Sequence, residues 1–120
     1  MAESQGIFRD ATGANLDAYR WNARPVLVFA PAPGHADYDR QMDILRNAEG
    51  GLAERDIVVL GDTARATTAL RKSFAPENFL VVLIGKDGGV KLSRTEPISA
   101  DMLFDTIDAM PMRRREMREE

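Results

Sequence analysis

The sequence predicts an α/β domain in which a mixed four-stranded sheet lies between two layers of helices. Apolar runs of strand length at residues 24–30, 56–62 and 78–85 alternate with segments in which apolar residues recur at helical spacing. The runs are apolar without alternation, as expected for strands that helices cover on both faces. A chain of 120 residues fits one domain with one core.

The beginning of the chain combines a weakly patterned segment with the first strand. Residues 1–20 carry scattered apolar residues and turn-prone residues, which predicts a loose arm docked by Trp21. The run RPVLVFA at 24–30 is introduced by a proline and predicts the first core strand.

Helical spacing follows the first strand and a Pro/Gly loop. Asp37 is a candidate N-cap, and Gly50 with Gly51 would supply a left-handed stop. Apolar positions in between recur at steps of three and four: Tyr38, Met42, Leu45 and Ala48. The run DIVVLGD at 56–62 then predicts a second strand, which we expect to be parallel to the first because a helix connects them.

The second crossover and the hairpin after it are predicted from caps and turn residues. A short helix capped by Asp62 or Thr63 ends before Pro76. The run NFLVVLIG at 78–85 is the most apolar segment of the chain, and the KDGG that follows it predicts a hairpin turn. The alternating VKLSR after the turn predicts an edge strand.

The last helix completes the predicted order of elements. Ser99 caps this helix and Pro111 ends it. The order is then β-α-β-α-β-β-α, and right-handed crossovers leave few arrangements other than a thioredoxin-like sandwich. We therefore predict an N-terminal arm at 1–20, a thioredoxin-like domain at 21–112 and a charged tail at 113–120.

The composition excludes several classes of function. Sixteen Lys and Arg residues against nineteen Asp and Glu residues give a net charge of -3, so neither nucleic acid nor a membrane is expected as a partner. The absence of cysteine removes disulfides, thiolate chemistry and Cys-rich metal sites, and we predict no cofactor. No run has the length of a signal peptide or a membrane span, which predicts a soluble chain, cytoplasmic as given and periplasmic if an export signal was trimmed.

The loop between the first strand and the first helix is the candidate binding site. Ligands of α/β sheets bind beyond the carboxyl ends of the strands, and this loop occupies that position. Its candidate residues are Pro31, Pro33, Gly34, His35, Asp37 and Tyr38. A helix start lowers the pKa of a cysteine placed there, but this loop has no thiol. Thiol exchange and peroxide reduction are therefore not expected.

The strings YRWNARPVLVFAP, LIGKDGGVKL and IDAMPMRRREM resemble a family of small bacterial domains of unknown function. That family is related to the DUDES domain of animal extracellular-matrix proteins and more distantly to peroxiredoxins. The resemblance covers residues 16–118 and implies a thioredoxin-like fold without the redox cysteine, with no established activity or cofactor. Aligned on the peroxiredoxin pattern FxPxxxTxxC, His35 takes the place of the threonine and Tyr38 that of the peroxidatic cysteine, which a tyrosine cannot replace.

Three functions remain open on the sequence alone. The first is a non-catalytic interaction module that binds a protein or peptide through the loop or the tail. The tail offers three guanidinium groups that suit carboxylates: Arg113, Arg114 and Arg115. The second is a hydrolase-type enzyme in which His35 acts with Asp39. The third is Cu(I) binding by three thioethers: Met110, Met112 and Met117.

Overall fold

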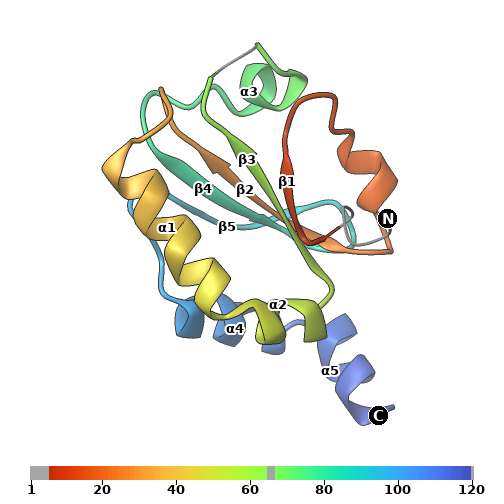
Figure 1. Ribbon diagram of the computed structural model, residues 1–120. Helices are drawn as coiled ribbons and strands as arrows, with labels where there is room; N and C mark the ends of the chain where they lie inside the picture. The colour runs from red at the N-terminus through yellow and green to blue at the C-terminus, as the bar shows by residue number, and fades with distance from the viewer. Residues whose placement is uncertain (1–5, 65–66, 120) are drawn as a thin grey trace.

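The sheet contains five strands in the order β1-β3-β2-β4-β5 (Figure 1). We describe it from a computed structural model that places residues 6–64 and 67–119. The strands are β1 (Phe8–Asp10), β2 (Arg24–Phe29), β3 (Ile57–Asp62), β4 (Leu80–Ile84) and β5 (Val90–Arg94). The helices are the 3-10 helix η2 (Leu16–Tyr19) and the α-helices α1 (Ala36–Asn47), α2 (Glu49–Glu54), α3 (Ala69–Phe74), α4 (Ala100–Asp108) and α5 (Pro111–Arg118).

The α/β class is confirmed, but the sheet has one strand more than the four predicted. β2 pairs in parallel with β3 and antiparallel with β4, which pairs antiparallel with β5. The additional strand, β1, runs parallel to β3 with Phe8 opposite Val59. It gave no periodic signal because it is three residues long and two of them are charged. The segment 1–20, predicted as a loose arm, thus contains a strand of the sheet, and its residues 1–5 lie outside the described part. Trp21 was expected to anchor this segment, but it is 60% exposed.

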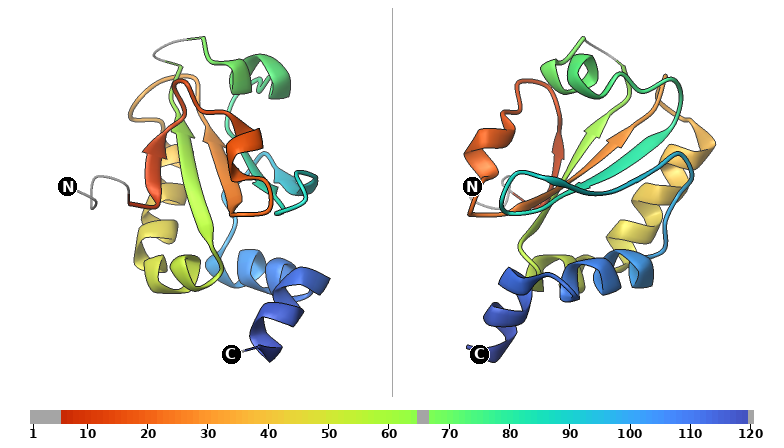
Figure 2. Two further views of the ribbon diagram at one scale, coloured as in Figure 1. Left: turned by 90° about the vertical axis from the view of Figure 1, so that its right-hand side faces the viewer. Right: turned by 180° about the vertical axis from the view of Figure 1, so that it is seen from behind.

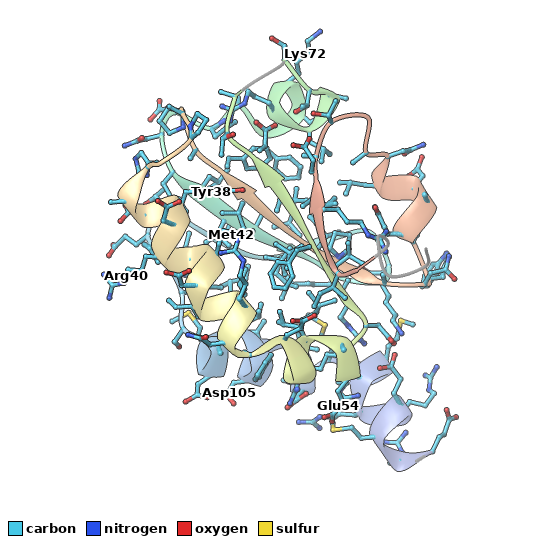
Figure 3. All side chains as sticks on the ribbon, in the orientation of Figure 1. Tyr38, Arg40, Met42, Glu54, Lys72 and Asp105 are labelled. Carbon is cyan, nitrogen blue, oxygen red and sulfur yellow. The ribbon has the colours of Figure 1, made fainter. Side chains whose placement is uncertain are left out.

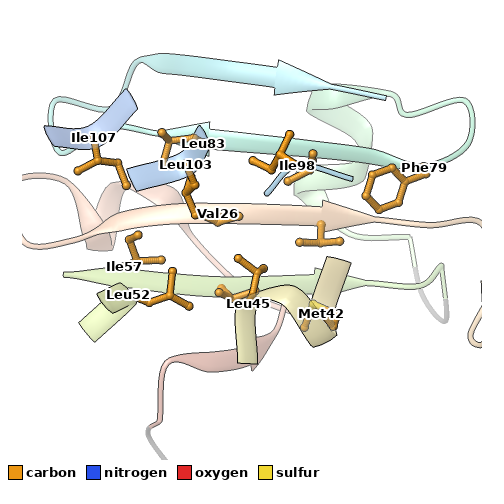
Figure 4. Packing of buried hydrophobic residues seen from close by; sticks show 13 residues of the cluster. Val26, Met42, Leu45, Leu52, Ile57, Phe79, Leu83, Ile98, Leu103 and Ile107 are labelled. Atoms are coloured by element: carbon orange, nitrogen blue, oxygen red, sulfur yellow. The ribbon is translucent and has the colours of Figure 1, made fainter. Parts of the chain in front are cut away.

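Both faces of the sheet are buried, which explains why the central strands are apolar throughout. Alternate residues of β2, β3 and β4 point to opposite faces. On one face α1, α2 and α4 cover a cluster that includes Val26 and Leu83 (Figure 4). On the other face η2 and α3 contribute to a second cluster that includes Leu27 and Leu70. Burial of one such side chain contributes about 1.5–3 kcal/mol to stability.

The first helical segment begins and ends earlier than predicted. His35, not Asp37, is the N-cap of α1 and has an extended backbone. α1 ends before the two glycines, and Gly50 and Gly51 lie inside α2 instead of forming a stop. A Cβ atom at Gly51 would come within 2.7 Å of the Phe104 ring on α4. The glycine therefore allows α2 and α4 to pack closely.

Side-chain caps fix the starts of α3 and α4. Thr68 Oγ1 accepts a backbone N–H at 2.9 Å and caps α3, so the predicted cap at Asp62 or Thr63 is wrong. Ser99 caps α4 as predicted, because its Oγ accepts a backbone N–H at 3.1 Å. The two caps each satisfy one of the N–H groups that a helix start leaves without a helical partner.

A proline begins the last helix instead of ending the helical part of the chain. Pro111 occupies the first turn of α5, where its missing N–H has no partner in any case. Most of the predicted tail at 113–120 is therefore helical, and Glu120 lies outside the described residues. Figure 2 shows α5 at the end of the sheet where β2 and β3 begin and α3 at the opposite end. We call these the amino end and the carboxyl end of the sheet.

Candidate functional site

The predicted binding loop lies at the carboxyl end, where β2 and β3 both finish (Figure 1). Ala30 follows β2, is fully buried, and donates its N–H to Asp62 O at 2.9 Å. The next four residues, Pro31 to Gly34, are exposed. Gly34 has a left-handed φ of 81°, which turns the chain into α1. The loop therefore reaches solvent at the position where α/β sheets usually bind ligands.

The His35 side chain makes an aromatic contact with Phe79. Its ring lies nearly parallel to that of Phe79, with centroids 6.4 Å apart and an interplanar angle of 11°. Its Nδ1 is buried and has no hydrogen-bond partner among the described residues. Asp39, the predicted partner of His35, donates its backbone N–H to His35 O at 2.9 Å, which is a helical bond and leaves the imidazole without an orienting carboxylate at Nδ1.

Tyr38 extends from α1 across the sheet (Figure 3). Its hydroxyl lies so close to Gly61 of β3 that a Cβ atom would not fit at that position. Burial raises the pKa of the Tyr38 hydroxyl, so the side chain is a neutral phenol at physiological pH. The residue aligned with a catalytic thiol thus fills the space between helix and sheet.

Asp62, predicted only as a possible helix cap, is a buried carboxylate with several hydrogen-bond partners at the carboxyl end. Its side chain is 2% exposed. Oδ2 accepts from Thr68 Oγ1 at 2.6 Å, and Oδ1 accepts from the backbone N–H of Ala64 at 2.9 Å. Oδ1 also accepts from Arg71 Nε and Nη2 at 3.0 and 2.8 Å. The same guanidinium donates to Ala30 O at 2.7 Å, so it links the ends of β2 and β3.

These bonds determine what Asp62 can do chemically. Burial opposes its ionisation, but the hydrogen bonds from Thr68, Ala64 and Arg71 outweigh burial and hold the pKa of the carboxyl below its ordinary value. A carboxylate that is ionised with a lowered pKa and hydrogen-bonded at both oxygens is a poor general base at neutral pH. The hydrogen bonds of Asp62, Thr68 and Arg71 therefore hold the ends of β2 and β3 together next to the loop.

The open edge of the sheet next to this end is β5. Four of its five residues are exposed, and Leu92 is half-buried. Arg94 Nη1 donates to Ser93 O at 2.9 Å, so the Ser93 carbonyl points away from β4. In an antiparallel strand the N–H and C=O of one residue point the same way, so the Ser93 N–H also points outward. Outward backbone groups of this kind are what an added strand binds.

A hollow of about 560 Å³ lies beside the last residues of β5. It is lined by the segment 74–80, which joins α3 to β4, together with Ser93 and Thr95. Phe79 lines the hollow and also stacks on His35, so the hollow adjoins the predicted binding loop. The open edge, the hollow and the loop thus meet at the carboxyl end.

The three arginines of the predicted tail differ in burial. Arg113 is 1% exposed and donates to Glu54 at 2.8 Å and to Asp108 at 3.2 Å. It therefore joins α5 to α2 and α4, and the prediction that it belongs to a solvated contact surface is wrong. Figure 3 shows Glu54 on α2 beside α5. Arg114 and Arg115 are exposed and stay candidate contacts.

A second buried guanidinium, Arg24 at the start of β2, faces the same helix. Its Nη1 and Nη2 donate to the two oxygens of Glu116 at 3.3 and 3.2 Å, and Nη1 also donates to Arg55 O at 2.8 Å. Lys86 donates to Glu116 at 2.7 Å and to Asp56 at 2.8 Å. Burial opposes the ionisation of Glu116, but the hydrogen bonds from Lys86 and Arg24 hold its pKa below the ordinary value. Arg24 Nε is buried and has no partner among the described residues, a deficit that costs about 1–3 kcal/mol.

Residues 6–64 and 67–119, the part of the chain that the structure describes, contain no His, Cys, Asp or Glu cluster suited to a metal ion and no helix that could span a membrane. In these ranges no three His, Cys, Asp or Glu side chains gather as a metal site requires. Of the thioethers considered for Cu(I), Met110 and Met112 line the same cavity, whereas Met117 is 38% exposed and does not line it. None of the helices described in these ranges is both long and apolar enough to cross a bilayer.

The solved structures that resemble this chain include two peroxiredoxin-type proteins and a thioredoxin. The reduced 2-Cys peroxiredoxin of Plasmodium vivax superposes with a TM-score of 0.64 and 17% identity, covering 87% of this chain and 85% of that one. Thioredoxin peroxidase I of Plasmodium yoelii gives 0.63 and 18%, covering 89% and 82%. Chloroplastic thioredoxin z gives 0.59 and 14%, covering 85% and 91%. At these identities the likeness shows the thioredoxin fold alone.

Sequence comparison finds a family and a larger relative. Residues 15–116 match the family described as "Domain of unknown function (DUF4174)". The coiled-coil domain-containing protein 80 of Danio rerio is 28% identical over 133 aligned positions, which include 85% of this chain. The chain spans only 15% of the length of that relative.

Proposed function

This chain belongs to the DUF4174 family, and we propose that it is a non-catalytic interaction module that binds an extended peptide along β5. The observation that carries the proposal is the open edge of β5, where the backbone N–H and C=O of Ser93 point outward and four of five side chains are exposed. An extended peptide adds to such an edge through main-chain hydrogen bonds and gains specificity from pockets for its side chains.

The chemistry at the carboxyl end supports binding over catalysis. The loop has no thiol, Tyr38 occupies the aligned position as a neutral phenol, and both oxygens of Asp62 are engaged. The exposed loop residues from Pro31 to Gly34 lie beside the hollow and are available as additional contacts. A hydrolytic role for His35 and Cu(I) binding by the methionines remain predictions.

The charge of β5 indicates the chemistry of the peptide. The strand carries Lys91 and Arg94 and no acidic residue. A peptide with acidic side chains next to these positions is favoured, because opposite charges on neighbouring strands stabilise pairing. A second copy of β5 would bring two cationic strands together. The hollow offers Asn78, Ser93 and Thr95 as hydrogen-bonding groups and Phe79 as an apolar contact for a side chain at one end of the peptide.

The experiment uses a proline that removes one outward N–H. Ser93→Pro deletes the donor on the solvent side of an edge strand, a position where proline is compatible with a sheet. Ser93→Ala is the matched control, since it keeps the N–H and removes only the hydroxyl. Peptides selected from a displayed random library against the wild-type protein would be synthesised and titrated by calorimetry against all three proteins.

We expect the selected peptides to be acidic and Ser93→Pro to weaken their binding by about tenfold or more, equivalent to one main-chain hydrogen bond or more. Ser93→Ala should bind within about twofold of the wild type. The proposal is wrong if Ser93→Pro binds as well as the control, or if no peptide is enriched. It is also wrong if sedimentation shows that β5 is occupied by a second copy and that Ser93→Pro converts a dimer to a monomer.

Two finer expectations about ancestry and location stay predictions. They are kinship with the DUDES domain of animal matrix proteins, together with a bacterial source, and a location outside the cytoplasm if an export signal was trimmed. Binding of an acidic peptide by a cysteine-free module suits either compartment, because it uses no redox-sensitive group.

A further inference from the structure

A cavity of about 170 Å³ lies at the amino end of the sheet, between the β4–β5 hairpin and the start of α5. Its walls are Arg24, the hairpin residues 85–87, Lys91 and the segment 110–112. It is separate from the hollow at the carboxyl end, because β5 runs from one end of the sheet to the other and the two share no lining residue. The peptide site proposed above shares Lys91 with the cavity but not its apolar wall.

One wall of the cavity is apolar and adaptable. It consists of Met110, Pro111 and Met112, in the bend between α4 and α5. Methionine side chains are unbranched and polarizable, so they fit ligands of different shape. A cavity of roughly 150 Å³ holds a benzene molecule, so this one has room for one phenyl-sized group.

Three cationic residues also line the cavity. Arg24, Lys86 and Lys91 line the cavity, whereas Asp87 is its single carboxylate among the lining residues. Arg24 is fully buried and fixed by Glu116 and Arg55, so its charge cannot turn to solvent. Lys86 shares the same Glu116, so two cations depend largely on one carboxylate, and the additional partner of Lys86 is a half-exposed aspartate.

Lys91 is the cation that can be redirected most easily. Its ammonium contacts Asp87 at 2.9 Å, four residues away along the chain, and both side chains are partly exposed. Exposed pairs of this kind contribute little to stability, so a ligand carboxylate can compete for the ammonium at small cost. The Lys91 stem passes over Gly85, where a Cβ atom would lie 2.5 Å from Lys91 Cε, and the glycine therefore keeps the side chain at the cavity.

From this juxtaposition we propose that the cavity binds a carboxylate attached to one apolar group of about phenyl size. The apolar group lies against Met110, Pro111 and Met112, and the carboxylate contacts Lys91 and lies in the field of Arg24 and Lys86. A free small acid and the C-terminal residue of a polypeptide share this chemistry.

The test follows methionine methyl signals by NMR while 3-phenylpropionate is added. Met112 lines the cavity, and Met117 is exposed on the same helix outside it, so the second methyl is an internal control. We expect the Met112 signal to shift saturably and the Met117 signal to remain in place. Phenylpropanamide, which lacks the charge, should bind at least about fivefold more weakly, as should acetate, which lacks the apolar group.

Two variants separate the cavity from general charge effects. Lys91→Met keeps an apolar stem and should weaken 3-phenylpropionate about fivefold while leaving phenylpropanamide unchanged. Lys72→Met, on α3 at the opposite end of the sheet (Figure 3), should change neither. Acetyl-glycyl-phenylalanine with a free carboxylate distinguishes the sources, since tighter binding than 3-phenylpropionate indicates a polypeptide C-terminus and weaker binding a free acid.

Three results would overturn the proposal. They are equal binding of acid and amide, unchanged binding in Lys91→Met, and equal shifts at Met112 and Met117. A folded state of both variants is expected because the two lysines lie on the surface, and unchanged unfolding curves would verify it.

Discussion

The two ends of the sheet each contain a buried charge, of opposite sign and with different pairing. At the carboxyl end one anion, Asp62, receives four hydrogen bonds from Thr68, Ala64 and Arg71. At the amino end a buried cation, Arg24, shares Glu116 with Lys86, and its Nε has no partner in the part of the chain that the structure describes. Both oxygens of the buried anion accept hydrogen bonds, whereas the buried cation has one N–H without an acceptor among the described residues.

The largest loss of stability is expected when the cluster of Asp62, Thr68 and Arg71 is broken. Asp62→Ala should lower the free energy of unfolding by about 3 kcal/mol, because it leaves the Arg71 guanidinium without its buried partner. Glu116→Gln should cost only about 1 kcal/mol, since Lys86 retains Asp56 and Arg24 retains Arg55 O. Urea unfolding at neutral pH measures both.

The comparison depends on the ratio of these two costs. Asp62→Asn serves as a control, because it keeps a side-chain oxygen for Ala64 and Arg71 and should fall between the wild type and Asp62→Ala. If Glu116→Gln proves more costly than Asp62→Ala, the amino end is the better paired of the two and the contrast drawn above is reversed.

Acid should reduce the stability that Asp62 and Glu116 contribute, over the same pH range at both ends of the sheet. Asp62 and Glu116 have pKa values lowered by folding, so the folded protein binds fewer protons than the unfolded chain. The stability that they contribute is fully present above their ordinary values near pH 4 and is lost as pH falls through the lower folded values. We expect the free energy of unfolding to fall as the pH is lowered from about 5 to about 3.

Two variants show which carboxylates cause this loss of stability in acid. The decline in stability should be shallower in Asp62→Asn and in Glu116→Gln than in the wild type, since each removes one titrating carboxylate. Urea unfolding repeated at several pH values gives the slope. Identical slopes in all three proteins would show that other carboxylates, such as Asp108, dominate acid unfolding.

The smallest effect concerns the end of α3, the helix that supplies Arg71. Ala75 ends this helix with a left-handed backbone, φ 47° and ψ 54°, and its side chain is exposed. Ala75→Gly should raise the free energy of unfolding by about 1 kcal/mol, because glycine adopts this conformation without the steric cost. Thermal unfolding measures the gain, and Ala53→Gly inside α2 is a control that should lose stability.

Much of the fold could be predicted because its signals are local. The strands near 24–30, 56–62 and 78–85 are apolar on both faces, and Ser99 caps its own helix. β1 could not be predicted, because three residues with two charges form a strand only through the neighbouring β3. Its place in the sheet depends on tertiary pairing and not on a pattern in its own residues.

For the candidate site, the sequence predicts the position of the loop but not the partners of its polar groups. The loop lies at the carboxyl ends of the strands as expected, but the partners that define the polar groups are distant in sequence. Arg24 meets Glu116 92 residues later, and Asp62 meets Arg71 across a turn and a helix start. An arginine at the start of a strand gives no signal that it is buried, and an arginine in a charged run gives none either, which is why Arg113 was misplaced.

The short first strand has a consequence for assembly. A sheet that accepts strands at both edges can join copies into an open-ended array. Here the β3 edge is already occupied by β1, which has only three residues, two of them charged, and offers little backbone for further growth. A strand that adds to the β5 edge therefore cannot be followed by growth at the β1 edge. Strand addition should give complexes of fixed stoichiometry and not fibrils.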